Sequence, residues 1–291
     1  MRNTFINHLT ELAKENKNIF LLVGDVGYNV IEKFKNYFPD RFLNVGVAEQ
    51  NMTSIAAGLA SQGYHVFTYS IANFPTFRCA EQIRNDIDYH NLPVTIVSVG
   101  GGVSYGNLGY SHHAIQDYGL IRMMPNFKIA SPGDSNEVIS VLNYLTKRPQ
   151  PSYLRLGKNT ENNYTSYKKN IVAGKWYPLP SNKGHENVIL STGTSLKWVM
   201  NNIERFKKKD IYTLPLWGMS EKQKQKSISR QFSSIITVED HLYDCGFGSW
   251  LKESINFSNT NRSIQSLALS TEVTSMVSSE ENILKKMRIY N

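Results

Sequence analysis

The sequence is poor in cysteine and contains no long apolar run. Its 291 residues include two cysteines, Cys79 and Cys245, too few for a disulfide framework and too few for a zinc site without histidines. No apolar stretch approaches the roughly 20 residues that a membrane-spanning helix needs. The N-terminal segment has no apolar signal core and instead has the pattern of an amphipathic helix. We therefore expect a protein of the reducing cytoplasm without a membrane span.

Acidic residues are fewer than basic ones, 24 against 32, which gives a formal net charge of +8. The basic residues are scattered, apart from a short run at 207–209, and no nucleic-acid reader motif accompanies them. This distribution argues against nucleic-acid binding. Two interpretations of the charge stay open: a Lys- and Asn-rich composition typical of AT-rich genomes, or an anionic substrate or partner.

Short apolar runs alternate with helix-like segments along the first half of the chain. The runs that predict strands lie at 19–23, 64–70, 94–100, 126–130 and 151–156, and the segments that predict helices lie at 2–17, 51–59, 80–89 and 134–145. This alternation is typical of a parallel α/β sheet. A second series follows, with strands at 188–191 and 235–238, a helix at 196–206 and another helix opening at 246–249.

Between the two series the chain becomes rich in Asn, Lys, Tyr and Ser with weak periodicity, as linkers do. We therefore expect two α/β domains, each a mostly parallel sheet flanked by helices. The first domain covers residues 1–160, the linker 161–186 and the second domain 187–291.

Two segments near strand ends carry acidic residues. Asp25 lies in a Gly-Asp-Val-Gly turn after the first strand, without the spacing of a dinucleotide or phosphate loop. Such turns border ligand crevices in open α/β sheets. Glu49 lies between a strand end and an apolar helix, where poor hydration would raise the pKa of its carboxyl group. A helix-start Glu that interacts with the helix dipole is the alternative.

Two other segments carry rings. Phe74 and Phe77 lie three residues apart at a predicted helix start and fit either a core position or a cofactor platform. His112 and His113 are adjacent in a Tyr- and Gly-rich loop, where histidines are more often functional than structural. A zinc site at this loop would lack a nearby Cys or paired carboxylate at ligand spacing.

In this order, these segments resemble the transketolase family. The likeness covers residues 44–52, 74–77, 106–113, 129–134, 151–158 and 237–248. It is greatest to the second subunit of two-chain transketolases, and deoxyxylulose-phosphate synthase and the beta subunit of 2-oxo-acid dehydrogenases share the same plan. The resemblance implies a pyrimidine-binding fold, a transketolase C-terminal fold and thiamine diphosphate bound across a subunit interface.

The chain lacks the family's Gly-Asp-Gly motif with its following Asn pair, which holds the diphosphate through magnesium. The resemblance therefore implies that an N-terminal diphosphate-binding subunit holds the diphosphate and Mg²⁺, and that this chain supplies no metal ligand. A homodimer of this chain within an α2β2 heterotetramer is the implied assembly.

The resemblance also assigns cofactor-binding residues. Glu49 matches the carboxyl group that hydrogen-bonds the pyrimidine ring nitrogen; a protonated Glu in an apolar pocket would favour the imino form that activates the cofactor. Phe74 and Phe77 match aromatic positions around the pyrimidine, with Phe77 as the stacking face. Asp25 joins them as a cofactor-binding candidate.

On the substrate side, the resemblance implies transfer of a two-carbon ketol unit between sugar substrates. His112 matches a histidine that contacts substrate hydroxyls and shuttles protons, and Arg2 and Lys158 match phosphate-binding arginines. Gly100 stands where transketolases usually place another histidine, and Leu108 where many place an acidic residue. These departures favour a modified or nucleotide-linked sugar. The alternatives are the beta subunit of a 2-oxo-acid decarboxylating enzyme and a non-catalytic regulatory homologue, against which the intact Glu argues.

Overall fold

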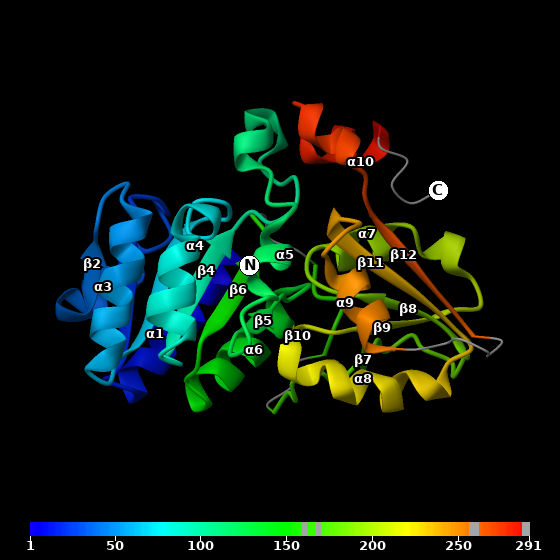
Figure 1. Cartoon of the computed structure of the whole chain (residues 1–291), viewed down its shortest axis with the longest axis horizontal. Coiled ribbons are helices and arrows are strands. Elements are labelled where there is room, and N and C mark those ends of the chain that lie inside the picture. The colour runs from blue at the N-terminus through cyan, green and yellow to red at the C-terminus, as the bar shows by residue number, and fades with distance from the viewer. Residues whose placement is uncertain (159–161, 167–169, 256–261, 287–291) are drawn as a thin grey trace.

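The computed structural model describes residues 1–158, 162–166, 170–255 and 262–286. Within these residues the strands form two sheets, one of seven strands and one of five. Figure 1 shows the two sheets side by side, each with helices packed around it. The predicted fold class, two α/β units with mostly parallel sheets flanked by helices, is confirmed.

The first sheet has the order β10-β5-β6-β4-β3-β1-β2. Its strands are β1 (Ile19–Val23), β2 (Phe42–Asn44), β3 (His65–Ile71), β4 (Val94–Val99), β5 (Lys128–Ala130), β6 (Ser152–Leu156) and β10 (Leu216–Gly218). Neighbouring strands are parallel except β10, which runs antiparallel to β5. Because helices cover both faces, β3 and β4 are buried along nearly their whole length, which explains their continuous apolar sequences.

Helices cover the two faces of this sheet unequally. On one face lie α1 (Arg2–Glu15), α2 (Glu32–Tyr37) and α6 (Ser135–Lys147). On the other lie α3 (Glu49–Ser61) and α4 (Ala80–Gln82), which continues as a π-helix over Ile83–Asp88. The short α5 (Asp117–Ile121) lies towards the second sheet. The first turn of α6 is capped by Asp134, whose side chain accepts a hydrogen bond from the Glu137 backbone N–H at 2.9 Å.

The second sheet has the order β12-β11-β8-β9-β7. Its strands are β7 (Tyr177–Pro178), β8 (Asn187–Ser191), β9 (Asp210–Thr213), β11 (Ser234–Leu242) and β12 (Ser263–Leu269), and its helices are α7 (Ser195–Asn201), α8 (Lys222–Ile228), α9 (Phe247–Ser254) and α10 (Glu280–Lys286). All pairs are parallel except β7 with β9. Buried apolar residues of β8, β11 and α7 form its core.

Two strands cross the predicted domain limits. β10 comes from the predicted second domain but joins the first sheet, and β7 comes from the predicted linker but joins the second sheet. Part of the predicted linker, residues 161 and 167–169, lies outside the described residues. The limits at 160 and 186 stay predictions.

A buried ionic cluster joins the two units. Arg155 on β6 donates hydrogen bonds to Asp117 Oδ2 at 2.7 Å, to Asp240 Oδ1 on β11 at 2.5 Å and to the Ala114 carbonyl at 2.6 Å. Asp240 also accepts a hydrogen bond from Thr194 Oγ1 at 2.6 Å. Removing one partner from such a cluster leaves a buried charge uncompensated, so the cluster favours one arrangement of the two units. Among the described helices, none is both long and apolar enough to cross a membrane.

Candidate active site

Glu49 is the buried acidic residue at the centre of the candidate site. It is the first residue of α3, and 1% of its surface is exposed. Its Oε1 accepts a hydrogen bond from Ser70 Oγ at 3.2 Å, and its Oε2 pairs with Arg78 Nη1 at 2.6 Å. Gly24 lies against the same carboxyl group, because a Cβ built there would be 3.6 Å from Glu49 Oε1. The carboxyl is therefore buried as predicted, but among polar partners and not in a purely apolar pocket.

A chain of ring contacts leads from Arg78 to the histidine loop. The Arg78 guanidinium lies over the Phe74 ring, 4.8 Å from its centroid, a favourable cation–π arrangement. The Phe74 ring meets His112 edge-on, with 5.2 Å between the ring centroids. Burial lowers the pKa of His112, which favours the neutral imidazole, able both to accept and to donate a proton. The structure thus brings together Glu49, Phe74 and His112, which lie far apart in the sequence.

Tyr105 connects His112 to the two predicted basic residues. Its ring centroid lies 6.3 Å from that of His112, and Lys158 Nζ lies 4.6 Å from the ring centroid on its face. The pKa of Tyr105 is raised by burial, while the nearby positive charge of Arg2 opposes the shift. Arg2 and Lys158, 156 positions apart, therefore both approach one aromatic ring.

A cavity of about 280 Å³ opens at the carboxyl ends of β1, β3 and β4. It is lined by Arg2, Val26, Gly27, Tyr28, Tyr69, Ser70, Ile71, Val99 and Tyr105. Ser70 also donates its hydrogen bond to Glu49, so the cavity reaches the buried carboxyl group. This is the edge of a parallel sheet at which ligands bind in open α/β folds. Its lining combines a cation with hydroxyl groups and aromatic rings, which suits a hydroxylated anionic ligand.

Two predicted residues lie at the border of this constellation. Phe77 exposes 47% of its surface, so a ring face is accessible beside Arg78. Asp25 has a positive φ of 54° and accepts a hydrogen bond from Asn44 Nδ2 at 2.9 Å. Its backbone N–H donates to Asn44 Oδ1 at 3.1 Å. The Asp25 carboxylate is thus fixed in the turn next to Gly24.

Three residues of the site were missed by the sequence reasoning: Ser70, Arg78 and Tyr105. Arg78 follows Phe77 directly, and Tyr105 lies within the Tyr- and Gly-rich loop, so proximity to recognised motifs was the available signal. Ser70, at the end of an apolar strand, carried no signal of its own.

The structure also changes the interpretation of Gly100. A Cβ at this position would lie 2.1 Å from Tyr105 Cε2, and its φ is +86°. The Tyr105 ring therefore fills the space beside Gly100, and the expected loss of a polar side chain is accompanied by the gain of a phenol. Leu108, in contrast, exposes 56% of its surface.

The loop that carries His112 is held by the C-terminal segment. The Ser278 backbone N–H donates to the Gly106 carbonyl at 3.2 Å, and Ser104 Oγ donates to Glu280 Oε1 at 3.2 Å. Figure 1 shows this loop next to α10 at the upper edge of the molecule. The second domain thus fixes a loop of the candidate site in the first.

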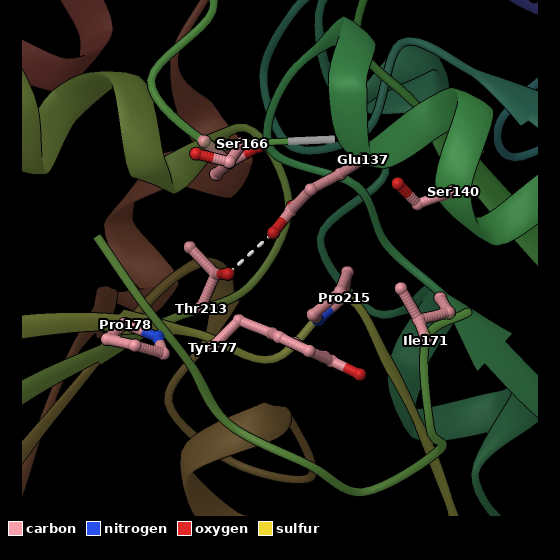
Figure 2. Close-up of a pocket in the computed structure, with 9 residues that line it drawn as sticks. Glu137, Ser140, Ser166, Ile171, Tyr177, Pro178, Thr213 and Pro215 are labelled. Atoms are coloured by element: carbon pink, nitrogen blue, oxygen red, sulfur yellow. Dashed lines mark hydrogen bonds between the residues drawn. The ribbon is translucent and has the colours of Figure 1, made fainter. Parts of the chain in front are cut away.

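A different, enclosed pocket lies between α6, β7 and β9. Figure 2 shows Glu137 and Thr213 pointing towards each other across it, joined by a hydrogen bond of 2.5 Å. The space inside measures about 10 Å³, barely enough for one water molecule. This pocket is therefore a feature of the domain junction and not a substrate site.

Comparison with known proteins gives consistent matches. The model of the transketolase pyrimidine-binding domain matches residues 1–162. One of the two subunits of the apulose-4-phosphate transketolase of Phocaeicola vulgatus is 30% identical over 88% of this chain and 83% of its own length. A putative transketolase C-terminal section of Methanocaldococcus jannaschii is 31% identical over 91% of this chain and 84% of its own.

Longer enzymes and a solved structure also match. 1-Deoxy-D-xylulose-5-phosphate synthase of Clostridium perfringens is 28% identical over 91% of this chain but 44% of its own length, so this chain spans less than half of that enzyme. A split-gene transketolase, solved as an inactive β4 tetramer, superposes with a TM-score of 0.84 at 25% identity. That match covers 98% of this chain and 92% of the other.

Proposed function

Since the chain belongs to the transketolase family, with a pyrimidine-binding domain followed by a C-terminal domain, we propose that it is the catalytic-site half of a split transketolase. In this proposal it transfers a two-carbon ketol unit between sugar substrates together with an N-terminal diphosphate-binding subunit. The observation that carries the proposal is Glu49, buried at the carboxyl ends of parallel strands and linked through ring contacts to His112.

The residues present fit the aminopyrimidine part of thiamine diphosphate. A buried carboxyl group at the start of α3 lies near the Phe74 ring and the exposed Phe77 ring, a combination that suits a polar heteroaromatic ring. When bound, thiamine diphosphate would supply the carbon nucleophile of the reaction. Glu49 would hold or release the proton shared with the pyrimidine nitrogen. The diphosphate and Mg²⁺ would be held mainly by the partner subunit.

His112 would act on the substrate. Its ring, with a lowered pKa, would accept or donate a proton at a substrate hydroxyl near neutral pH. Arg2 and Lys158 would attract an anionic group at the far end of the cavity, next to Tyr105. Lys158 would act as a point charge, because an ammonium group lacks the bidentate geometry of arginine.

The test is reconstitution with an N-terminal transketolase subunit, thiamine diphosphate and Mg²⁺. We expect formation of a two-carbon-extended product from a ketose phosphate donor and an aldose acceptor, and none from pyruvate. Carbon dioxide release from pyruvate would instead support a 2-oxo-acid decarboxylating enzyme. Absence of turnover with both donor classes, in a complex that assembles, would reject the catalytic role.

A further inference from the structure

Both carboxyl oxygens of Glu49 already have partners. Ser70 Oγ, from the end of β3, donates to Oε1 at 3.2 Å, and Arg78 donates to Oε2 at 2.6 Å. Any ligand that hydrogen-bonds this carboxyl must therefore share or replace one of these two contacts. Which contact yields is decided by where each partner lies.

The two partners differ in their access to solvent. Ser70 is completely buried, so its contact lies on the inner side of the carboxyl group. The side chain of Arg78 is 44% exposed, while that of Glu49 is 1% exposed. The guanidinium therefore lies between the carboxyl group and solvent, and the outer oxygen is reached by displacing it.

From this geometry we propose that Arg78 is a removable cap on Glu49. In the cap-closed state, the guanidinium occupies Oε2 and stabilises the charged carboxylate. In the open state, it leaves this oxygen free for a ring nitrogen of a ligand. This inference rests on the proposed function for the identity of the ligand, but the cap itself is a property of the free chain.

The surroundings of Arg78 allow it to leave. Besides Glu49, its guanidinium contacts the face of Phe74 at 4.8 Å, and cation–π contacts of exposed groups are weak. The residue lies in a 3₁₀ turn between Phe77 and α4, so its side chain can turn into solvent without moving a strand. The closed cap also removes the acid form of Glu49 that proton sharing needs, because a cation beside a carboxyl group favours its ionised form.

The experiment compares Arg78→Met, which keeps the length and apolar character of the side chain, with the matched control Arg84→Met. Arg84 lies in the adjoining π-helix, is exposed and hydrogen-bonds the neighbouring Asn85. In the free chain, carbon-13 NMR of labelled Glu side chains reports the protonation of Glu49, with Glu49→Gln identifying its signal. We expect Glu49 to take up its proton at a higher pH in Arg78→Met than in wild type and Arg84→Met.

The second readout is thiamine diphosphate affinity, measured by equilibrium dialysis of the complex assembled with the partner subunit and Mg²⁺. Apparent affinity falls in proportion to the fraction of protein in the competent state, so opening the cap should tighten binding by about tenfold or more. An unchanged Glu49 titration, or affinity that is equal or weaker in Arg78→Met, would overturn the cap. If no variant, wild type included, bound the cofactor, the proposed function would fail, while the titration would still decide whether the cap exists.

Discussion

Glu49 is the residue on which the proposed chemistry depends most, and Glu49→Gln tests it. Gln has nearly the same shape, and its amide oxygen can still accept a hydrogen bond from Ser70 or Arg78. We expect the free energy of unfolding to change by less than about 1.5 kcal/mol. Turnover of the assembled complex should fall by roughly a hundred- to ten-thousand-fold, because an amide cannot hold and release the proton. Turnover within a few-fold of wild type would remove Glu49 from the mechanism.

Gly100 gives a second test at the residue scale, directed at packing. Ala at this position would adopt a φ of +86° and place its Cβ 2.1 Å from the Tyr105 ring. The backbone cost is about 1–2 kcal/mol and the overpacking cost about 1–3 kcal/mol. We therefore expect Gly100→Ala to lower the free energy of unfolding, measured in urea, by a few kcal/mol.

The matched control for this substitution is Gly46→Ala. Gly46 also has a positive φ, of +72°, but its Cβ would meet nothing within 4 Å. It should show the backbone cost alone. Adding Tyr105→Ala to Gly100→Ala should restore part of the loss by removing the ring. If the Gly100 and Gly46 variants lose equal stability, the Tyr105 ring does not occupy the space beside Gly100 in solution.

The site was only partly predictable from single residues. Glu49 and His112 were identifiable because a carboxyl group and a histidine lie within recognisable motifs. Arg78 was not, because its significance comes from a contact with a residue 29 positions earlier. Tyr105 became important only when the fold placed its ring beside Gly100 and under Lys158. Such contacts depend on tertiary structure and leave no local pattern.

Among the elements, strands buried on both faces were the most predictable. β1, β4 and β8 have short continuous apolar runs, which a parallel sheet requires. The edge strands β2 and β12 escaped prediction, since many of their side chains are partly exposed and their sequences are mixed. β10 escaped because three residues give no periodicity, and its pairing with β5 is set by contact between the two units.

The helix α6 carries a test of pH dependence. Burial raises the pKa of Glu137 from 4.5 to about 7. Between these values the folded chain keeps a proton that the unfolded chain releases. Stability from this group is therefore complete below about pH 4.5, falls by about 1.4 kcal/mol per unit as the pH rises to 7, and is then constant. Glu137→Gln should remove this slope.

Gln can replace the protonated form of Glu137, because its amide oxygen can accept from the Gly133 N–H while its NH₂ group donates to Thr213 Oγ1, reversing the present hydrogen bond. Urea unfolding at several pH values between about 5 and 8 gives the comparison. Glu253→Gln, at an exposed ion pair, serves as the control. Parallel pH profiles for wild type and Glu137→Gln would show that Glu137 is ionised throughout this range in the folded chain.

At the scale of the whole molecule, the candidate site depends on both units. The cavity lies in the first unit, but its histidine loop is held by Ser278 and Glu280 of the second. The Arg155 cluster fixes the two units relative to each other from the inside. A change at the domain junction can therefore alter the position of His112 without touching the cavity.

The face that bears the candidate site also carries exposed apolar side chains. Tyr28, Leu43, Val47 and Phe77 expose between 43% and 74% of their surfaces and lie in the segments that follow β1, β2 and β3. Exposed apolar groups that cluster in this way commonly mark interfaces. We therefore expect the isolated chain to associate with itself and to bind thiamine diphosphate and Mg²⁺ weakly, because the diphosphate-binding motif lies in the partner.

Light scattering of the isolated chain should give a mass of at least two chains, and adding the N-terminal subunit should give a larger mixed complex. Obligate interfaces of this kind bury more than about 2,000 Å². Val47→Lys should weaken association because it places a charge on the apolar face, whereas Val172→Lys, at another exposed valine, should leave it unchanged. Cofactor binding and turnover should appear only in the mixed complex. A stable monomer in both conditions, or micromolar cofactor binding by the isolated chain, would contradict the two-subunit assembly.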